Sequence, residues 1–394
     1  MKAIGRLLLM IVVAQAARPV WADQIQGQLY PEKRTYLVGE PVYVVLDLTN
    51  PRNRPVWVSE SCAWLDTRFE APTAPKPRGG VSLFGCSGGT AGSCPGGAKE
   101  IRSGEHYTRR YLLSGAFQLD ASGVYPIRAW HKVDIYADET SFRIAASQEI
   151  VSKFELTLIG GTEKELASAY APILRDLNNP DAGKSWLARS AVVNNPPPFL
   201  ENVILAMADN PQTTTYGISG LERLATPRAK AKLAVLSVGE NPEYVRQMAI
   251  TALGGLGDPA YCSLMLDIAQ DSHEYSRFIA LRAAGYLCGE RAFPLLTSQL
   301  ASANYSTRFE AAFALGNSRS RDAVPLLIPL LLDADPNVRR AARDALAALT
   351  HRRSKDDEGP AEALHRDWNN WWTSNGATAP IYGIDDCKEP DPLQ

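Results

Sequence analysis

The sequence lacks the features that would place a protein in a membrane or on nucleic acid. Beyond the first 22 residues the longest apolar stretch, 324–332, is nine residues long and interrupted by proline, which is too short to span a bilayer as a helix. The 41 basic and 43 acidic side chains leave a formal net charge of −2, so no excess of positive charge would attract a polyanion. We therefore expect no nucleic-acid partner, and no transmembrane segment in the mature chain.

Catalytic and metal-binding motifs are also missing from the sequence. The five histidines are scattered along the chain, and none belongs to an HExxH pattern. There is no GxSxG nucleophile motif and no GxxxxGKS/T phosphate-binding loop. No two cysteines form a CxxC pair, the spacing typical of zinc sites and of thioredoxin-like redox centres. The sequence thus predicts no enzyme activity, no metal and no cofactor.

The first 22 residues have the layout of a secretory signal peptide. Lys2 and Arg6 precede an apolar run of 11 residues, 7–17, and Val20-Trp21-Ala22 satisfies the small-x-small rule for cleavage. An uncleaved anchor or a buried N-terminal strand is the alternative. We expect a secreted or periplasmic protein whose mature chain begins at residue 23.

The cysteine content fits that compartment. Six cysteines are an even number, and the oxidising environment outside the cytoplasm favours disulfides. Cys262 and Cys288 are expected at adjacent ends of one antiparallel helix pair, where a disulfide is geometrically sensible. Cys62 and Cys387 are left over, and the sequence leaves open whether they pair or stay free.

A glycine-rich segment, 78–97, contains Cys86 and Cys94. A glycine-rich loop that holds phosphate needs a glycine followed directly by lysine and then Ser or Thr, at the start of a helix, and no glycine of this segment is followed by lysine. We expect a long insertion closed by a Cys86–Cys94 disulfide. Because long ordered loops are often functional, a binding loop is the alternative.

The N-terminal part of the chain, 23–160, alternates apolar and polar residues with period two. Val42, Val44, Leu46 and Leu48 lie on one side of a candidate strand, and further candidates occupy 56–58, 107–113, 124–136 and 154–159. The segments 36–50 and 122–129 resemble strands of immunoglobulin-like domains in bacterial surface proteins. That resemblance implies an Ig-like antiparallel β-sandwich and says almost nothing about activity.

The C-terminal part repeats with a period of 31 residues. The repeat is marked by four arginines: Arg246, Arg277, Arg308 and Arg339. Alanine follows each arginine at positions +3 and +6, and glycine or alanine follows at +8. Each unit is predicted to contain a first helix (helix A), a short polar turn and a second helix (helix B) that carries the arginine. Such units bury a face only by stacking, which indicates an α-solenoid.

The run 338–349 and its relatives resemble HEAT repeats, especially the short bacterial type also found in phycobilisome-lyase-like proteins. The resemblance covers 199–352 and implies an interaction surface rather than lyase activity. Together with the N-terminal part, the whole chain resembles exported HEAT-repeat proteins that have an Ig-like domain. We therefore expect a multidomain β plus α chain, with a helical linker at 161–198 that caps the solenoid and a tail at 353–394 with a tryptophan-rich cap helix.

Candidate binding residues come from the outward positions of helix B. At 100° per residue, positions +1, +5 and +8 from the arginine are predicted to point toward a groove or solvent. Large apolar and basic side chains at +1 and +5 are the candidates for protein binding: Phe278, Arg282, Phe309, Phe313 and Arg340. Exposed apolar patches usually mark contact surfaces. The alternative is that solenoid curvature or the N-terminal domain covers them.

Two other sets of side chains have both a structural and a functional explanation. The arginine column is expected to tie neighbouring repeats through carboxylates or carbonyls, with anion binding as the alternative. Trp368, Trp371 and Trp372 share one face of a helix and are expected to cap the last repeat, with sugar binding as the alternative.

These observations together predict a non-catalytic scaffold that binds protein partners. A structural component of the cell envelope is one alternative. An enzyme accessory or inhibitor that acts through the Cys86–Cys94 loop is another.

Overall fold

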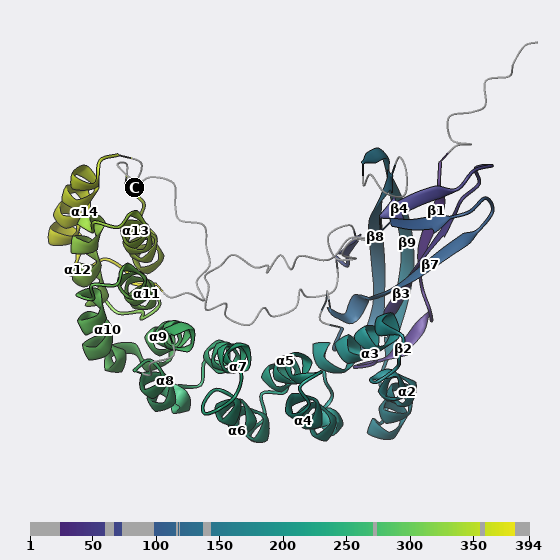
Figure 1. The fold of residues 1–394 in the computed structure, drawn as a ribbon, viewed down its shortest axis with the longest axis horizontal. Helices are drawn as coiled ribbons and strands as arrows, with labels where there is room; N and C mark the ends of the chain where they lie inside the picture. Colours follow the sequence, from purple (N-terminus) through teal and green to yellow (C-terminus); the bar gives the residue numbers. More distant parts are fainter. Residues whose placement is uncertain are drawn as a thin grey trace, which may run out of the picture.

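The computed structural model describes residues 24–59, 67–72, 98–115, 117, 119–136, 143–270, 274–354 and 359–382. The expected signal peptide and the expected Cys86–Cys94 loop lie outside the described residues, as do Cys62 and Cys387. Figure 1 shows the sheets at one end of an arc and a curved double row of helices along the rest of it.

The sheet region is built from short strands and one long hairpin. The strands are β1 (Gln26–Pro31), β2 (Thr35–Leu37), β3 (Tyr43–Thr49), β4 (Val56–Ser59), β5 (Thr67–Glu70), β6 (Ala98–Ile101), β7 (His106–Leu112), β8 (Gly123–Tyr136) and β9 (Ile144–Ile159). One sheet has the order β1-β3-β7, and the other has the order β2-β9-β8-β4-β6 with β5 also paired to β8.

The second sheet is mixed, so the expectation of purely antiparallel pairing is wrong for one pair of strands. Strand β2 runs parallel to β9, with Tyr36 opposite Leu158. Between β1 and β3, which are neighbours in the first sheet, the chain crosses to the edge of the second sheet and back. The buried Tyr36 side chain anchors this crossing, because its hydroxyl donates to the carbonyl oxygen of Tyr43 at 3.2 Å.

The two sheets share one hydrophobic core. Alternate residues of β3 are buried, among them Leu46 and Leu48, and so are alternate residues of β8, among them Ile127 and Val133. All of these side chains belong to the same cluster of buried residues. Period two in the sequence therefore corresponds to one face of each strand packed against the opposite sheet.

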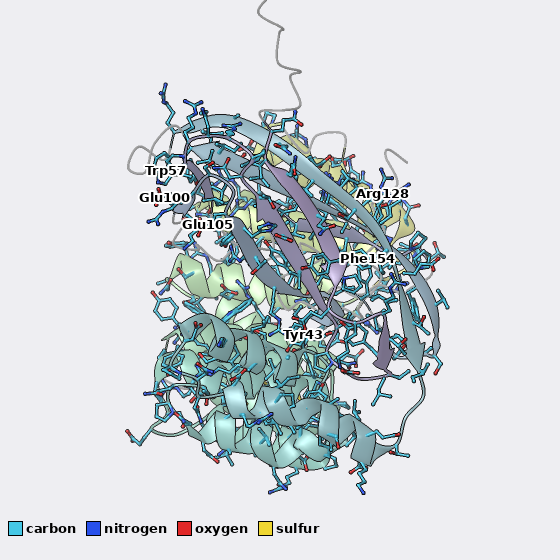
Figure 2. All side chains as sticks on the ribbon, turned by 90° about the vertical axis from the view of Figure 1, so that its right-hand side faces the viewer. Tyr43, Trp57, Glu100, Glu105, Arg128 and Phe154 are labelled. Carbon is cyan, nitrogen blue, oxygen red and sulfur yellow. A yellow bond between two sulfur atoms is a disulfide. The ribbon has the colours of Figure 1, made fainter. Side chains whose placement is uncertain are left out.

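Two helices join the sheets to the repeats, α2 (Glu163–Asp176) and α3 (Ala182–Asn194). Thr162 and Glu165 form a capping box at the start of α2, which fixes where the helix begins. Leu187 and Ala191 of α3 pack with Leu112 and Tyr43. Figure 2 labels Tyr43 at the place where the sheets meet the helices. The segment expected to be a linker is thus packed against both parts of the chain.

The repeat region follows as α4 (Glu201–Asp209), α5 (Thr214–Leu224), α6 (Pro227–Leu236), α7 (Glu243–Gly255), α8 (Cys262–Ile268), α9 (Glu274–Cys288), α10 (Phe293–Leu300), α11 (Tyr305–Gly316), α12 (Ala323–Leu327) and α13 (Pro336–Thr350). In Figure 1, α5, α7, α9, α11 and α13 form the inner row of the arc and α4, α6, α8, α10 and α12 form the outer row. Helix B of each repeat therefore lies on the concave side.

Successive helices B approach closely at the glycine column. A Cβ atom on Gly285 would lie 2.2 Å from the carbonyl oxygen of Ala314, and one on Gly316 would lie 2.7 Å from the Cβ of Ala345. Position +8 of one repeat thus packs against position +6 of the next. The expectation that +8 faces a groove or solvent is wrong, because the neighbouring helix B occupies that side. Ala347, at +8 in the last of these helices, is only half-buried and has room for its methyl group.

The last helix, α14 (Ala361–Asn375), closes the end of the array. It packs against the short 3-10 turn η6 (Ile328–Leu332), and the side chain of Trp368 is fully buried in the core of the repeats. Trp371 and Trp372 are partly buried against the same core. Trp368 therefore lies where a cap on the last repeat would place it. Among the helices that the structure describes, none is both long and apolar enough to cross a membrane.

Candidate protein-binding groove

A groove of about 450 Å³ runs across the helices B on the concave side of the repeats. Its lining comes from α7, α9, α11 and α13 and consists of Gln247, Tyr275, Phe278, Ile279, Arg282, Tyr305, Ser306, Phe309, Glu310, Asn337 and Arg340. A volume of this size is within the range of ligand-binding pockets in proteins.

The centre of the groove is aromatic. Phe278 and Phe309 are both half-buried and occupy position +1 of consecutive repeats, which is why they lie side by side on α9 and α11. Tyr275 and Tyr305, in the first turns of the same helices, are 66% and 49% exposed. Rings held this far open to water form the kind of apolar surface that a partner covers.

Arg282 is held in place within the groove by α11. Its guanidinium donates from Nη2 to Glu310 Oε1 at 2.7 Å and from Nε to Glu310 Oε2. The guanidinium carbon also lies 4.6 Å from the centroid of the Phe313 ring. The paired carboxylate neutralises the charge of Arg282, so this arginine links two repeats as well as lining the groove.

The two ends of the groove are polar. Gln247 stands on α7, and Asn337 and Arg340 stand on α13. Arg340 is exposed, and among the described residues it has no ion-pair partner. The groove therefore has an apolar centre and one uncompensated positive charge at its α13 end.

Four of the five candidate binding residues line this groove. The fifth, Phe313, contacts Arg282 instead of lining the groove. The most exposed rings, Tyr275 and Tyr305, were not among the candidates. They stand two and three residues before their arginines, so they do not fall into one column of the repeat. A tyrosine in the first turn of both α9 and α11 was the signal that could have found them.

The arginines of the column bond to carbonyl and carboxylate groups, as expected, although Arg339 reaches only the turn of its own repeat and not a neighbouring one. Arg246 and Arg339 each donate to a carbonyl oxygen six or fewer residues upstream, at Asn241 and Asp333, both at 2.7 Å. Arg308 donates to the carbonyl oxygen of Ser302 at 2.8 Å and also forms a paired contact with the Asp333 carboxylate. For Arg277 the corresponding carbonyls lie outside the described residues.

Cys262 and Cys288 form a disulfide, with their Cα atoms 5.1 Å apart. Cys262 begins α8 and Cys288 ends α9, so the bond joins helix A to helix B of one repeat. No three His, Cys, Asp or Glu side chains gather into a metal-binding group among the residues placed here.

A smaller hollow of about 160 Å³ lies where the sheets meet α2 and α3. Six charged side chains line it, and four of them form two ion pairs, Lys33 with Glu40 and Arg110 with Glu32. Burial raises the pKa of Tyr36, which lines it, to about 12, so this hydroxyl stays protonated at neutral pH. These ion pairs and the protonated phenol indicate that the hollow belongs to the packing contact between the sheet region and the first helices.

Comparison with known protein families identifies the repeats. Residues 231–306 and 293–357 match the family of HEAT repeats, so the expectation of HEAT repeats is confirmed over this part of the chain. No curated protein matches the sequence significantly.

Several solved structures are similar to the helical part of the chain. The X-ray structure of YibA from Escherichia coli covers 51% of this chain and 77% of its own, with 16% identity and a TM-score of 0.35. A computationally designed armadillo repeat protein for modular peptide recognition covers 48% and 94%, with 16% identity and a TM-score of 0.29. Human deoxyhypusine hydroxylase covers 52% and 96%, with 16% identity and a TM-score of 0.24. These values carry no argument about function.

Proposed function

We propose that this chain is a non-catalytic scaffold that binds protein partners through the groove across α7, α9, α11 and α13. HEAT repeats typically mediate protein–protein interaction. The observation that carries the proposal is the exposure of Tyr275 and Tyr305 beside Phe278 and Phe309 on a concave surface. Aromatic residues are enriched among the side chains that contribute most to binding at protein interfaces.

The proposal includes an exported location and an Ig-like sheet region. The disulfide between Cys262 and Cys288 supports export, because such bonds persist mainly in oxidising compartments. Two sheets packed over one core support the Ig-like interpretation, although the parallel pairing of β2 with β9 departs from a simple antiparallel sandwich. In this arrangement the sheet region would offer a second contact surface.

The experiment is an affinity capture from the cell-envelope extract of the source organism, quantified by mass spectrometry. The full-length chain is compared with Phe309→Asp, which places a charge in the centre of the groove. A second variant, Tyr275→Ala, removes an exposed ring that contributes little to the fold. Val235→Asp is the matched control, because Val235 is 61% exposed on α6 in the outer row.

We expect partners that are retained by the wild type and by Val235→Asp and lost with both groove variants. Circular dichroism of each variant confirms that the helices are intact. Partners that bind all four proteins equally would contradict the groove as the working surface.

A further inference from the structure

The aromatic side chains of the groove recur with the helix repeat. Tyr275 and Phe278 stand on α9, and Tyr305 and Phe309 stand on the next helix B, α11. The phenylalanines share position +1, and each tyrosine lies in the first turn of its helix. Packed helices lie about 8–10 Å apart, so the two aromatic pairs are separated by roughly that distance. A segment that crosses the helices therefore meets one aromatic pair at each helix.

This spacing matches one kind of extended peptide. A polyproline II helix has three residues per turn and rises about 3.1 Å per residue, which places equivalent side chains about 9 Å apart. In a β-strand, side chains on one face recur every two residues, or about 6.6 Å, and fall out of step with the helices. Aromatic-lined grooves bind proline-rich segments because this conformation is preformed and loses little entropy on binding.

The charge of Arg340 indicates which kind of ligand residue would lie at the α13 end of the groove. The carboxylate of Glu310 neutralises Arg282 in the middle of the groove, so the apolar centre carries no net charge. Arg340, one helix further along, is exposed and has no carboxylate partner among the described residues. A ligand carboxylate at this end would form the ion pair that Arg340 lacks.

We propose that the groove binds a proline-rich segment of a partner protein in the polyproline II conformation, with an acidic residue of that segment against Arg340. The inference rests on the proposed function and names the chemistry of the partner. The distance from α9 to α13 is two helix spacings, about 18 Å, which six residues of a polyproline II helix span. The contact with Phe278 and Phe309 supplies affinity, and the contact with Arg340 sets which end of the segment lies on α13.

The test is fluorescence anisotropy with labelled synthetic peptides and the full-length chain. The first probe has three Leu-Pro-Pro triplets with an aspartate at each end, so that it can bind in either direction. The second has asparagine in place of both aspartates. The third alternates threonine and valine between the same aspartates, with the same length and charge but a preference for the β conformation.

We expect the acidic proline probe to bind best, the neutral one about fivefold more weakly, and the β-prone one weakest, since an exposed ion pair contributes up to about 1 kcal/mol. Arg340→Glu should remove the advantage of the acidic proline probe over the neutral one. Arg366→Glu, on the exposed face of α14, should leave it unchanged. Tyr275→Ala should weaken both proline probes.

Equal binding of the β-prone probe would overturn the conformational part of the inference, and an unaltered preference in Arg340→Glu would overturn the role of Arg340. A groove filled by a second copy of this chain would appear as concentration-dependent dimerisation that Tyr275→Ala abolishes, and this also would overturn it. If the peptides fail while captured partners still depend on Phe309, the proposed function stands and only the peptide chemistry is wrong.

Discussion

Arg308 donates two hydrogen bonds to the carboxylate of Asp333, one from Nε and one from Nη2, each at 2.8 Å. Both side chains are largely buried. Arg308 belongs to α11, and Asp333 lies in the turn that leads into α13, so the contact ties one repeat to the next. Asp333 Oδ1 also accepts from the backbone N–H of Asp335, which caps the start of α13. One carboxylate thus holds both the preceding helix B and the following one.

This pairing predicts the response of the repeats to acid. The hydrogen bonds from Arg308 lower the pKa of Asp333 below its ordinary value of 3.8. A carboxylate with a depressed pKa stabilises the fold fully above that ordinary value, and its contribution is lost as the pH falls through the lowered pKa. Urea unfolding at pH 7 should show Asp333→Asn to be less stable by about 2 kcal/mol. The difference from wild type should shrink between pH 4 and pH 2. Asp209→Asn, which breaks an exposed pair with Lys232, is the control and should change little at either pH.

The glycine column predicts a steep cost for a single methyl group. Gly285→Ala would place a Cβ against the backbone oxygen of Ala314, which cannot move without shifting α11. We expect a loss of about 1–3 kcal/mol in the free energy of unfolding, although alanine is the better helix former. Gly123→Ala, where the nearest atom lies 3.7 Å away, should be tolerated. A Gly285→Ala protein as stable as wild type would show that the repeats can slide apart freely.

The disulfide between α8 and α9 should contribute a large share of the stability of its repeat. Cys262 and Cys288 are 26 residues apart in sequence, and a loop of that length predicts about 3–4 kcal/mol in the chain-entropy account of disulfides. Replacing both with alanine should lower the urea midpoint by a corresponding amount. Addition of a reducing agent should then destabilise the wild type more than the Cys262→Ala/Cys288→Ala protein.

The cap helix should be needed by the last repeats but not by the sheets. Trp368 is completely buried, and truncation of a buried tryptophan costs about 3–5 kcal/mol. In Trp368→Ala, hydrogen exchange should therefore accelerate in α12, α13 and α14 while β3 and β8 keep their protection. Uniformly faster exchange along the whole chain would mean that the array unfolds as a single unit.

The repeat region was the most predictable part of the chain, and its physics explains why. Each helix B meets the same neighbours in every repeat, so the need for small residues at +6 and +8 appears as a column in the sequence. The prediction that the glycines at +8 face a groove or solvent was nevertheless wrong. Angles around one isolated helix separate its two sides, but they do not say that Gly285 touches the next helix B rather than solvent.

The sheet region was harder to predict from sequence. The buried alternation of β3 and β8 is long enough to be recognised, whereas β5 and β6 each bury a single residue, Thr67 and Ile101, and therefore carry no period. The parallel strand β2 is three residues long and is defined by its contact with β9, more than 120 residues later. A local pattern carries no information about such a distant partner.

The groove was located through its less exposed residues. Phe278 and Phe309 share a column and were found by their spacing, while Tyr275 and Tyr305 project from the first turns of their helices at unequal distances from the arginines. How far a side chain stands out of a concave surface depends on the packing of at least three helices, which the spacing of one column does not report.

The Gly–Ala contacts between helices B also couple the curvature of the arc to the binding of a ligand in the groove. Because Gly285 and Gly316 hold α9, α11 and α13 in close contact, a change in the curvature of the arc would change the spacing of Phe278, Phe309 and Arg340. A ligand that contacts these three helices would resist changes in the curvature of the arc. By the reciprocity of linked equilibria, tension between the sheet end and the cap would loosen that ligand.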